Sequence, residues 1–227
     1  MLLFCLKIMR NLDRNPQESA KKKFERHYFT RRPDTKPKKI IIKTVIKGIP
    51  FKFYSSTCIF SKCHVDRASQ LLIEKGIAFG DVLDFGCGYG AIGIAMKVFN
   101  PDINLHMSDL NERALQLARR NAVINSVPAS IKKGAYLDCW KERTFDVILL
   151  NPPMSAGRDV CFRMIEEAYL HLKENGILEV VSFHNKGGQM IEQKILEIFN
   201  NVKTIAKSGG ARIYAGKKTD EITTLDR

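Results

Sequence analysis

Short apolar runs alternate with stretches of helical periodicity from residue 80 onward, and this alternation constrains the fold more than any other feature of the chain. It is typical of a parallel sheet covered by helices. The last two runs are separated only by Ser208-Gly209-Gly210, too short for a helical crossover, so they must pair antiparallel. The apolar runs lie at 82–85, 105–108, around 131, 145–150, 177–182, 202–206 and 212–215, and the helical stretches at 91–99, 112–124, 160–172 and 189–199. The sequence therefore predicts an α/β fold with a doubly wound, mostly parallel seven-stranded sheet and a terminal antiparallel hairpin.

The segment before this region divides into two parts. Residues 1–38 contain three prolines and no clear apolar period, so we expect a basic arm of helix and loop there. Strand-like runs at 40–46 and 51–54 flank a turn at Gly48 and predict a small β unit packed on the core. Asp66 begins a helical pattern that ends at Gly76. We therefore predict an arm at 1–38, a β unit at 39–65, the main domain at 66–218 and a C-terminal tail at 219–227.

Positive charge is concentrated near the N-terminus. The chain has a net charge of +13, and residues 1–50 hold 14 Lys or Arg residues against 4 Asp or Glu residues, an excess of ten. Aromatic residues and histidine, including Phe24, Tyr28 and Phe29, are interspersed among these cations. Phosphate neutralisation combined with stacking on bases needs this combination, so we predict that the arm binds RNA. The alternative is a solvated tail that aids solubility.

Composition narrows the class of protein. No apolar stretch approaches the roughly 20 residues of a membrane span, so we expect a globular protein with no membrane partner. The first eight residues lack a basic region and a cleavage site, which indicates a frayed end with Met1 or Met9 as the start. The six cysteines show no C-x-x-C spacing, which favours reduced thiols and a cytoplasmic location. Cys58, Cys63 and His64 supply only three of the four ligands of a structural zinc, so we predict no metal.

A glycine-rich segment follows the first run of the sheet. Residues 84–93 read Asp-Phe-Gly-Cys-Gly-Tyr-Gly-Ala-Ile-Gly, and residues 88–93 match the G-x-G-x-x-G pattern of dinucleotide-binding loops. Glycines between a strand and a helix let the backbone approach a nucleotide cofactor closely. Asp84 argues against a dinucleotide, because a carboxylate repels a pyrophosphate but can hold an ammonium directly or through water. S-adenosylmethionine (SAM) carries such an ammonium, so the segment favours SAM over NAD.

A second carboxylate ends the next run. Asp109 lies 25 residues after Asp84. A carboxylate at this place accepts hydrogen bonds from ribose hydroxyls in both NAD and SAM folds, so it does not discriminate between them. The alternative is that Asp109 caps the following helix, a role that Asn111 can also serve. We predict that Asp109 contacts a ribose.

The tetrapeptide Asn151-Pro152-Pro153-Met154 closes the apolar run 145–150. Asn-Pro and Pro-Pro are ordinary turn signals after a strand. An Asn side-chain carbonyl beside a backbone carbonyl made rigid by prolines can, however, accept both hydrogens of a planar amino group. Placed after the glycine loop, the tetrapeptide therefore predicts the acceptor side of an N-methylation site.

The glycine loop, Asp109 and the Asn-Pro-Pro segment together resemble the class I SAM-dependent methyltransferases. Within them the chain is similar to the methyltransferase-small domain group, which includes the C-type guanine-N2 methyltransferases of small-subunit ribosomal RNA and their single-domain archaeal relatives. The likeness runs from about His27 to Gly216 and includes the closing Gly209-Gly210-x-Arg212-x-Tyr214 hairpin. The resemblance implies a Rossmann-like fold, SAM as the cofactor, and first and fourth strands that lie side by side.

The resemblance also assigns roles residue by residue. Many relatives have an acidic residue for the adenine amino group where this chain has Gly134-Ala135, with Asp138 as the nearest substitute. Met154 stands where relatives often have an aromatic residue, and its polarizable sulfur can still pack on a base. The expected cofactor-binding residues are Asp84, Gly86, Cys87, Gly88, Gly90, Asp109, Leu110 and Asn151, and the expected catalytic residues are Asn151, Pro152, Pro153 and Met154.

Five further residues are candidates for contact with the substrate. Phe60, Ser61 and Asp66 are expected near the pocket, and Arg158 and Lys186 are expected to contact a phosphate or a base. Each has an alternative interpretation: Phe60 as a core residue, Asp66 as a helix cap, and Arg158 and Lys186 as surface charges.

The sequence thus predicts a SAM-dependent N-methyltransferase that acts on an exocyclic amino group of an RNA base, with guanine N2 in ribosomal RNA or a small-subunit particle as the favoured target. Adenine N6 and a protein glutamine are the alternative acceptors, because the same Asn-Pro-Pro chemistry serves them. A non-catalytic RNA-binding module on this fold is the alternative from another class. A base inside a helix is inaccessible, so the target base must be unpaired or flipped.

Overall fold

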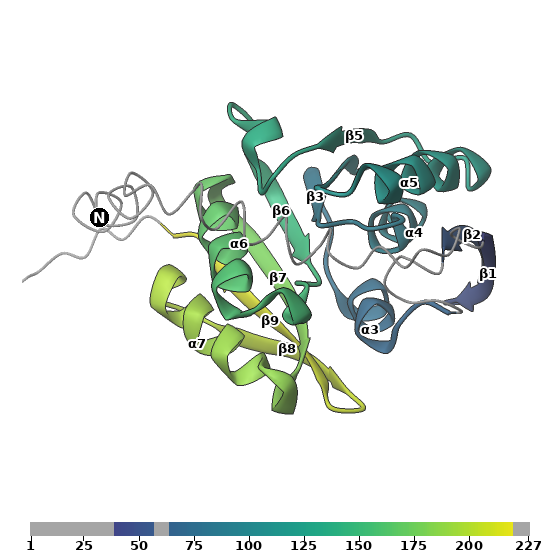
Figure 1. Ribbon diagram of the computed structural model, residues 1–227. Coiled ribbons are helices and arrows are strands. Elements are labelled where there is room, and N and C mark those ends of the chain that lie inside the picture. The colour runs from purple at the N-terminus through teal and green to yellow at the C-terminus, as the bar shows by residue number, and fades with distance from the viewer. Residues whose placement is uncertain (1–38, 57–63, 220–227) are drawn as a thin grey trace, which may run out of the picture.

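A computed structural model describes residues 39–56 and 64–219, and within them a seven-stranded sheet forms the centre of the molecule (Figure 1). The strand order is β5-β4-β3-β6-β7-β9-β8. Strands β3 to β7 pair in parallel, and β9 pairs antiparallel with both β7 and β8. The strands are β3 (Asp81–Phe85), β4 (Asn104–Asp109), β5 (Ser130–Lys133), β6 (Phe145–Leu150), β7 (Leu172–Phe183), β8 (Lys203–Ser208) and β9 (Ala211–Lys217). The predicted doubly wound sheet with a terminal antiparallel hairpin is confirmed.

Helices cover both faces of the sheet, because successive strand residues point to opposite sides. In β6, Val147 and Leu149 join one buried cluster, whereas Ile148 and Leu150 join the other. The first cluster lies under α3, α4 and α5, and the second lies under α6 and α7. The helices are α3 (Arg67–Lys75), α4 (Ala91–Phe99), α5 (Glu112–Ile124), α6 (Arg158–Leu170) and α7 (Gly188–Phe199), with short 3-10 helices at Asp138–Trp140, Met154–Ala156 and His184–Lys186. None of the helices in the described ranges is long and apolar enough to cross a membrane.

The region around the junction of α6 and β7 differs from the prediction. Helix α6 begins at Arg158, two residues earlier than predicted, because the chain leaves the preceding turn at Gly157 with a φ of 101°. It ends at Leu170, and strand β7 already begins at Leu172, where the sequence indicated helix. The early part of β7 pairs irregularly with β6, and an irregular stretch of this kind carries little alternating pattern.

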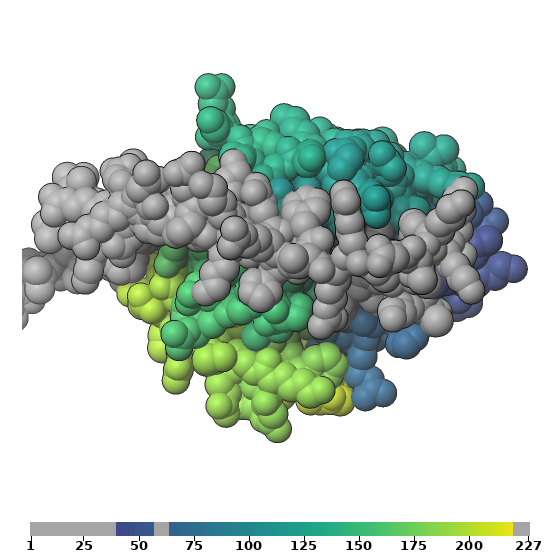
Figure 2. Space-filling model, in the orientation of Figure 1, coloured from purple at the N-terminus to yellow at the C-terminus, as the bar shows by residue number. Residues whose placement is uncertain are grey.

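A separate hairpin packs on the face that carries α3, α4 and α5. Its strands are β1 (Lys39–Ile46) and β2 (Ile49–Ser56), paired in register through the turn. Phe51 and Phe53 are buried and meet the rings of Phe99 and Tyr89 at centroid distances of 5.8 Å each. Figure 2, in the same orientation, shows the hairpin (purple) at one end of the molecule and α7 (yellow-green) on the other half.

Asn121 of α5 links this hairpin to the main domain. Its side chain is fully buried and accepts a hydrogen bond from Tyr54 N at 2.7 Å. It also donates to the carbonyl oxygens of Tyr54 and Tyr89 at 2.9 and 2.8 Å. Because Tyr89 belongs to the glycine-rich segment, the hairpin and that segment share one buried polar side chain.

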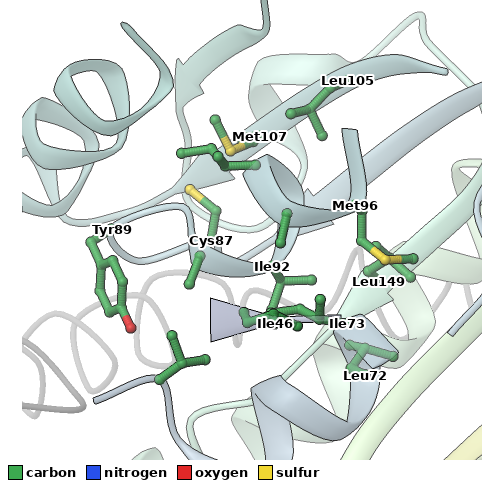
Figure 3. Close-up of a cluster of buried hydrophobic side chains, with 14 of the residues drawn as sticks. Ile46, Leu72, Ile73, Cys87, Tyr89, Ile92, Met96, Leu105, Met107 and Leu149 are labelled. Carbon is green, nitrogen blue, oxygen red and sulfur yellow. The ribbon is translucent and has the colours of Figure 1, made fainter. Parts of the chain in front are cut away.

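The core beneath α3 and α4 contains side chains from several elements of this face (Figure 3). Leu72 and Ile73 of α3, Ile92 and Met96 of α4, and Met107 of β4 lie in one buried cluster. All five side chains are 6% exposed or less, so the strand ends and the glycine loop rest on a close-packed base.

Glu179 is a buried carboxylate in the middle of β7. Its side chain is fully buried, and its two oxygens accept from Ile77 N at 3.3 and 3.2 Å. Burial raises the pKa of Glu179 from its ordinary 4.5 to about 8. Between these values the native state holds one proton more than the unfolded state, so stability falls as pH rises through this window, by at most about 1.4 kcal/mol per pH unit.

Glu179→Gln is therefore expected to remove most of this loss. The amide keeps an acceptor for Ile77 N but does not titrate, so the variant becomes more stable relative to wild type as pH rises from 5 to 9. Urea unfolding across this range measures the difference. Glu142→Gln is the matched control, because Glu142 is exposed. Parallel pH curves for wild type and Glu179→Gln would show that the carboxylate contributes nothing to pH-dependent stability.

Candidate active site at the carboxyl ends of β3, β4 and β6

Strands β3 and β6 are neighbours, so the loops that follow them leave the sheet together. Figure 1 shows β3 and β6 next to each other. Phe85 of β3 pairs with Leu150 of β6, so the residues that follow them, Gly86 and Asn151, leave the sheet at the same carboxyl edge. Helices leave β3 towards one side of the sheet and β6 towards the other, which makes this edge the topological switch point. Ligands of open α/β sheets bind in the crevice at such a point.

The glycine loop needs its glycines for conformation. Gly86, Gly88 and Gly90 have φ values of 74°, 56° and 89°, a region that side chains with a Cβ disfavour. Gly90 also caps α4 without any side-chain hydrogen bond. The N–H groups of Gly86 and Cys87 both donate to Ser108 O, at 2.8 and 2.9 Å. The loop is therefore fixed to the end of β4.

Gly93 serves a different purpose, the close approach of α4 to the sheet. A Cβ at this position would lie 3.0 Å from Met107 Sδ and 3.1 Å from both Cβ and Oδ2 of Asp84. The short distance lets Gly93 N donate to Asp84 Oδ2 at 2.8 Å. Gly93, the last glycine of the G-x-G-x-x-G pattern, thus allows the first turn of α4 to contact the Asp84 carboxylate.

Asp84 is 1% exposed, and burial is the main cause that raises the pKa of its carboxyl from 3.8 to about 7. The hydrogen bond from Gly93 opposes this shift, and the nearby charge of Asp109 adds to it. A buried carboxylate without a cation is costly, and an ammonium placed beside it would lower the pKa. The site is thus electrostatically suited to a cationic ligand and unsuited to a pyrophosphate.

Asp109 lies across the loop from Asp84. Its Oδ2 accepts from Gly88 N at 2.8 Å and its Oδ1 accepts from Asn111 N at 2.7 Å. Burial raises the pKa of this carboxyl as well. The residue that caps α5 is Asn111, whose side chain accepts from Arg113 N at 3.0 Å, so Asp109 is not needed as the helix cap.

Cys87 and Leu110 are the two other residues of this region that are expected to bind the cofactor. Cys87 is buried beside Ile92 and Met107, and burial raises the pKa of its thiol, so it remains protonated and apolar (Figure 3). Leu110 is half-buried and packs against the second core cluster. Within residues 39–56 and 64–219, no atom lies within 4 Å of a Cβ built on Gly88, so these residues leave the outer side of the loop uncovered.

The end of β5 borders the same edge. Gly134 N donates to Asp109 O at 3.2 Å, and Ala135 follows it. A Cβ built on Gly134 would lie 2.6 Å from Asp138 Oδ1. Asp138, which begins a 3-10 helix, thus places its carboxylate beside Gly134.

The Asn-Pro-Pro segment faces this loop from the end of β6. Asn151 is half-buried, and its Nδ2 donates to Ser69 Oγ at 2.9 Å. The carbonyl of Pro152 accepts from Met154 N at 2.9 Å and that of Pro153 from Ala156 N at 2.8 Å. A carbonyl oxygen has two lone pairs, so Pro152 retains the capacity to accept one further hydrogen bond.

Met154 packs inward from the first turn after the prolines. Its Sδ lies 3.8 Å from Cys161 Sγ of α6. A Cβ at Gly187 would collide with Met154 Cε, so the methionine also touches the turn before α7. This side chain therefore supports the segment from the α6 and α7 side.

The remaining candidate substrate-binding residues are Phe60, Ser61, Asp66, Arg158 and Lys186. Asp66 is the N-cap of α3, the helix that holds Ser69. The Arg158 side chain is 63% exposed and lies 3.9 Å from Asp159 Oδ1. Lys186 Nζ lies 5.7 Å from the ring centroid of Phe183. Phe60 and Ser61 lie outside the described residues.

The sequence predicts no metal site, and this stays a prediction. No three His, Cys, Asp or Glu side chains are grouped as metal ligands within 39–56 and 64–219. Cys58 and Cys63 lie outside these ranges, so their relation to His64 remains a prediction.

Sequence reasoning missed two residues of this site. Ser69 lies on a helix that reads as an ordinary amphipathic element, and its signal was its place three residues after the cap Asp66. Gly93 was noticed only as part of a pattern, and its role depends on the close approach of α4 to β3 and β4.

Two curated proteins are similar in sequence to this chain. Bacillus subtilis YbxB, described as an uncharacterized protein, is 34% identical over 198 residues that cover 85% of this chain and 98% of that protein. Ribosomal RNA small subunit methyltransferase C of Shewanella loihica is 31% identical over 165 residues that cover 70% of this chain. The aligned part is 47% of the Shewanella protein, so the chain spans about half the length of that methyltransferase.

Solved structures show the same fold. The structure of T. thermophilus RsmC, a 16S rRNA N2 methyltransferase in complex with AdoMet and guanosine, superposes with a TM-score of 0.70 at 22% identity. It covers 82% of this chain and 52% of that one. A methyltransferase from Pyrococcus furiosus gives a TM-score of 0.54 at 25% identity over 61% of this chain and 74% of that one.

A family model spans most of the chain. The model described as methyltransferase small domain matches residues 50–215, which include the glycine loop, the Asn-Pro-Pro segment and most of β2 and of the terminal hairpin. The match confirms the resemblance drawn from the sequence, the enzyme class and the cofactor. The chain belongs to the methyltransferase small domain family, and it is a methyltransferase that uses SAM.

Proposed function

We propose that this protein transfers a methyl group from SAM to the exocyclic amino group of an RNA base, with guanine N2 in ribosomal RNA as the target. The observation that carries the proposal is the position of Asn151, which directly follows β6 at the same edge of the sheet where Gly86 directly follows β3. The proposed acceptor and donor sides of the transfer reaction would then lie at one edge of the sheet.

The residues present fit SAM. Asp84 and Asp109 put two buried carboxylates near the ends of adjacent strands, and no atom of the described residues lies within 4 Å of a Cβ built on Gly88. Asp84 would hold the ammonium and Asp109 the ribose hydroxyls, while Asp138 is the proposed contact of the adenine amino group. Bound SAM supplies an already activated methyl group, so the chemical demand on the protein is chiefly positioning.

The Asn-Pro-Pro segment would supply that positioning. Asn151 Oδ1 and the free lone pair of Pro152 O accept the two hydrogens of the amino group, which aims the nitrogen lone pair at the methyl group. Orientation of this kind can lower a barrier by roughly 7 to 11 kcal/mol. No strong general base is needed, because the proton can leave to water after the positive charge forms on nitrogen.

RNA is the proposed substrate class because of the arm and the relatives. The excess of ten positive charges in residues 1–50 suits a polyanion, and the Shewanella relative is named as a ribosomal RNA methyltransferase. Arg158 and Lys186 are proposed phosphate or base contacts, and Phe60, Ser61 and Asp66 are proposed to border the pocket. A cytoplasmic location, where ribosomal RNA is accessible, stays part of the proposal.

Removal of residues 1–38 is expected to weaken RNA binding about tenfold or more and to reduce its dependence on salt. The reason is that each phosphate contact made by a Lys or Arg releases counterions, so fewer contacts give a shallower slope of log K against log salt. Filter binding between 50 and 200 mM salt measures both quantities. An unchanged slope would show that the arm does not contact phosphates.

Transfer of tritium from labelled SAM to separate acceptors tests the substrate class. Small-subunit particles, total RNA, DNA and a protein extract are each incubated with the enzyme, with Asn151→Ala as the control. Label in RNA alone is expected. Label in protein would favour glutamine as the acceptor, and RNA binding without any transfer would indicate a non-catalytic module.

A further inference from the structure

At the start of α3, Asp66 and Ser69 form a hydrogen-bonded pair that contacts Asn151 of the Asn-Pro-Pro segment. Asp66 Oδ1 accepts from the backbone N–H groups of Ala68 and Ser69, at 3.1 and 3.0 Å. Asp66 Oδ2 accepts from Ser69 Oγ at 2.6 Å. Ser69 is 6% exposed, so its hydroxyl is held inside the protein beside a carboxylate.

This pair fixes the direction of the hydroxyl proton. A serine hydroxyl has one proton to donate, and a carboxylate can only accept. The short Ser69 Oγ to Asp66 Oδ2 distance is typical of a charge-assisted hydrogen bond, so the proton points at Asp66. Towards any third group, Ser69 Oγ can therefore act only as an acceptor.

The third group is the Asn151 amide, 82 residues away in the sequence, whose nitrogen donates to Ser69 Oγ at 2.9 Å. With the amide turned over, Oδ1 would face an oxygen that has no proton for it, and one polar contact would be lost. The pair thus selects the amide orientation in which Nδ2 faces α3 and Oδ1 faces away from it.

We propose that Ser69, held by Asp66, is a positioning residue that keeps Asn151 Oδ1 available as the acceptor for the substrate amine. This inference rests on the proposed function, because the selected orientation matters only if the amide must accept. A turned amide would present its own N–H groups to the amino hydrogens, and donor would meet donor.

The test compares Ser69→Ala with wild type in steady-state methyl transfer to the RNA acceptor. We expect kcat to fall about tenfold to a hundredfold, as misorientation of a catalytic group does, while the Kd for SAM changes less than threefold. Ser55→Ala is the matched control, because Ser55 lies in β2 and its buried Oγ has no hydrogen-bond partner among the residues that the structure describes. Its kcat is expected to match wild type.

Asn151→Asp separates orientation from general packing. A carboxylate offers an acceptor on either side, so it cannot be misoriented in the same way. If Ser69 acts through the amide, Ser69→Ala costs kcat less than threefold in the Asn151→Asp background. An equal loss in both backgrounds would overturn the proposal.

Asp66→Asn provides a second route should Ser69→Ala fail to fold. Asn caps helices about as well as Asp, but it is a weaker acceptor and can donate to Ser69 Oγ, which frees the serine proton to hold the amide in the wrong orientation. A kcat loss of about tenfold is expected. Activity within twofold of wild type for both Ser69→Ala and Asp66→Asn would show that the Asp66–Ser69 pair does not position Asn151. No transfer by wild type itself would instead contradict the proposed function.

Discussion

Asn151→Ala is expected to lower kcat for methyl transfer by about 100- to 1000-fold, the loss seen when one hydrogen-bonding group aimed at a transition state is removed. The amide oxygen is the only side-chain acceptor that the Asn-Pro-Pro segment offers to the amine. The affinity for SAM should change less than threefold, because the carboxylates proposed to hold SAM lie on β3 and β4, whereas Asn151, although expected to contact the cofactor, contributes no charge to it. Calorimetry with SAM and single-turnover transfer measure the two effects separately.

Asn104→Ala is the matched control for this variant. Asn104 begins β4 at the opposite edge of the sheet and is exposed, so the same truncation there should leave transfer unchanged. Turnover by Asn151→Ala at the wild-type rate would remove Asn151 from the mechanism.

Asp84→Asn is expected to have opposite effects on cofactor affinity and on stability. The amide can still accept from Gly93 N, but it loses the charge that would hold the SAM ammonium. A hydrogen bond between charged groups contributes about 1.5 to 3 kcal/mol, so SAM should bind roughly 10- to 150-fold more weakly. NAD should bind neither protein, and a preference of wild type for NAD would contradict the cofactor assignment.

In the absence of SAM, Asp84→Asn should increase the stability of the protein. The native Asp84 pKa of about 7 lies above the unfolded value of 3.8. The native state therefore holds the extra proton in this window, and wild-type stability falls as pH rises from about 4 to 7. Asp84→Asn does not titrate, so above pH 7 it should be more stable than wild type. Equal stability at pH 8 would show that Asp84 ionises at no cost.

SAM affinity should depend on pH for the same reason. Wild-type affinity should rise as pH approaches 7, because the carboxyl must lose its proton to hold the ammonium. It should fall again above about 8, where an α-amino group loses its charge. Asp84→Asn should lack the lower limb of this profile, which calorimetry at pH 5.5 to 9 would detect.

The fold was largely predictable because its signals are local. Strand β6 and helices α4 and α5 were predicted at their observed bounds, since each has a compact apolar pattern and clear punctuation. The start of β7 at Leu172 was not predicted, because that stretch pairs irregularly with β6 and lacks a regular alternation.

The sequence predicted only those parts of the site whose residues lie together in one contiguous segment. The glycine loop and the Asn-Pro-Pro segment are contiguous, and their meeting follows from parallel strands that share an edge. The contact of Ser69 with Asn151 joins residues 82 positions apart, and no single-sequence pattern predicts the packing of α3 that makes it. The hydrogen bond from Met154 N to Pro152 O could likewise not be predicted from the sequence, because it depends on the path of the chain after the prolines.

The most direct test of the central claim is to identify the atom that receives the methyl group. Small-subunit ribosomal RNA is incubated with the enzyme and deuterated SAM, digested to nucleosides and analysed by mass spectrometry against synthetic standards. The account predicts labelled N2-methylguanosine with wild type and none with Asn151→Ala. Label on a ring carbon or a ribose oxygen, or labelled N2-methylguanosine at the wild-type level with Asn151→Ala, would contradict it.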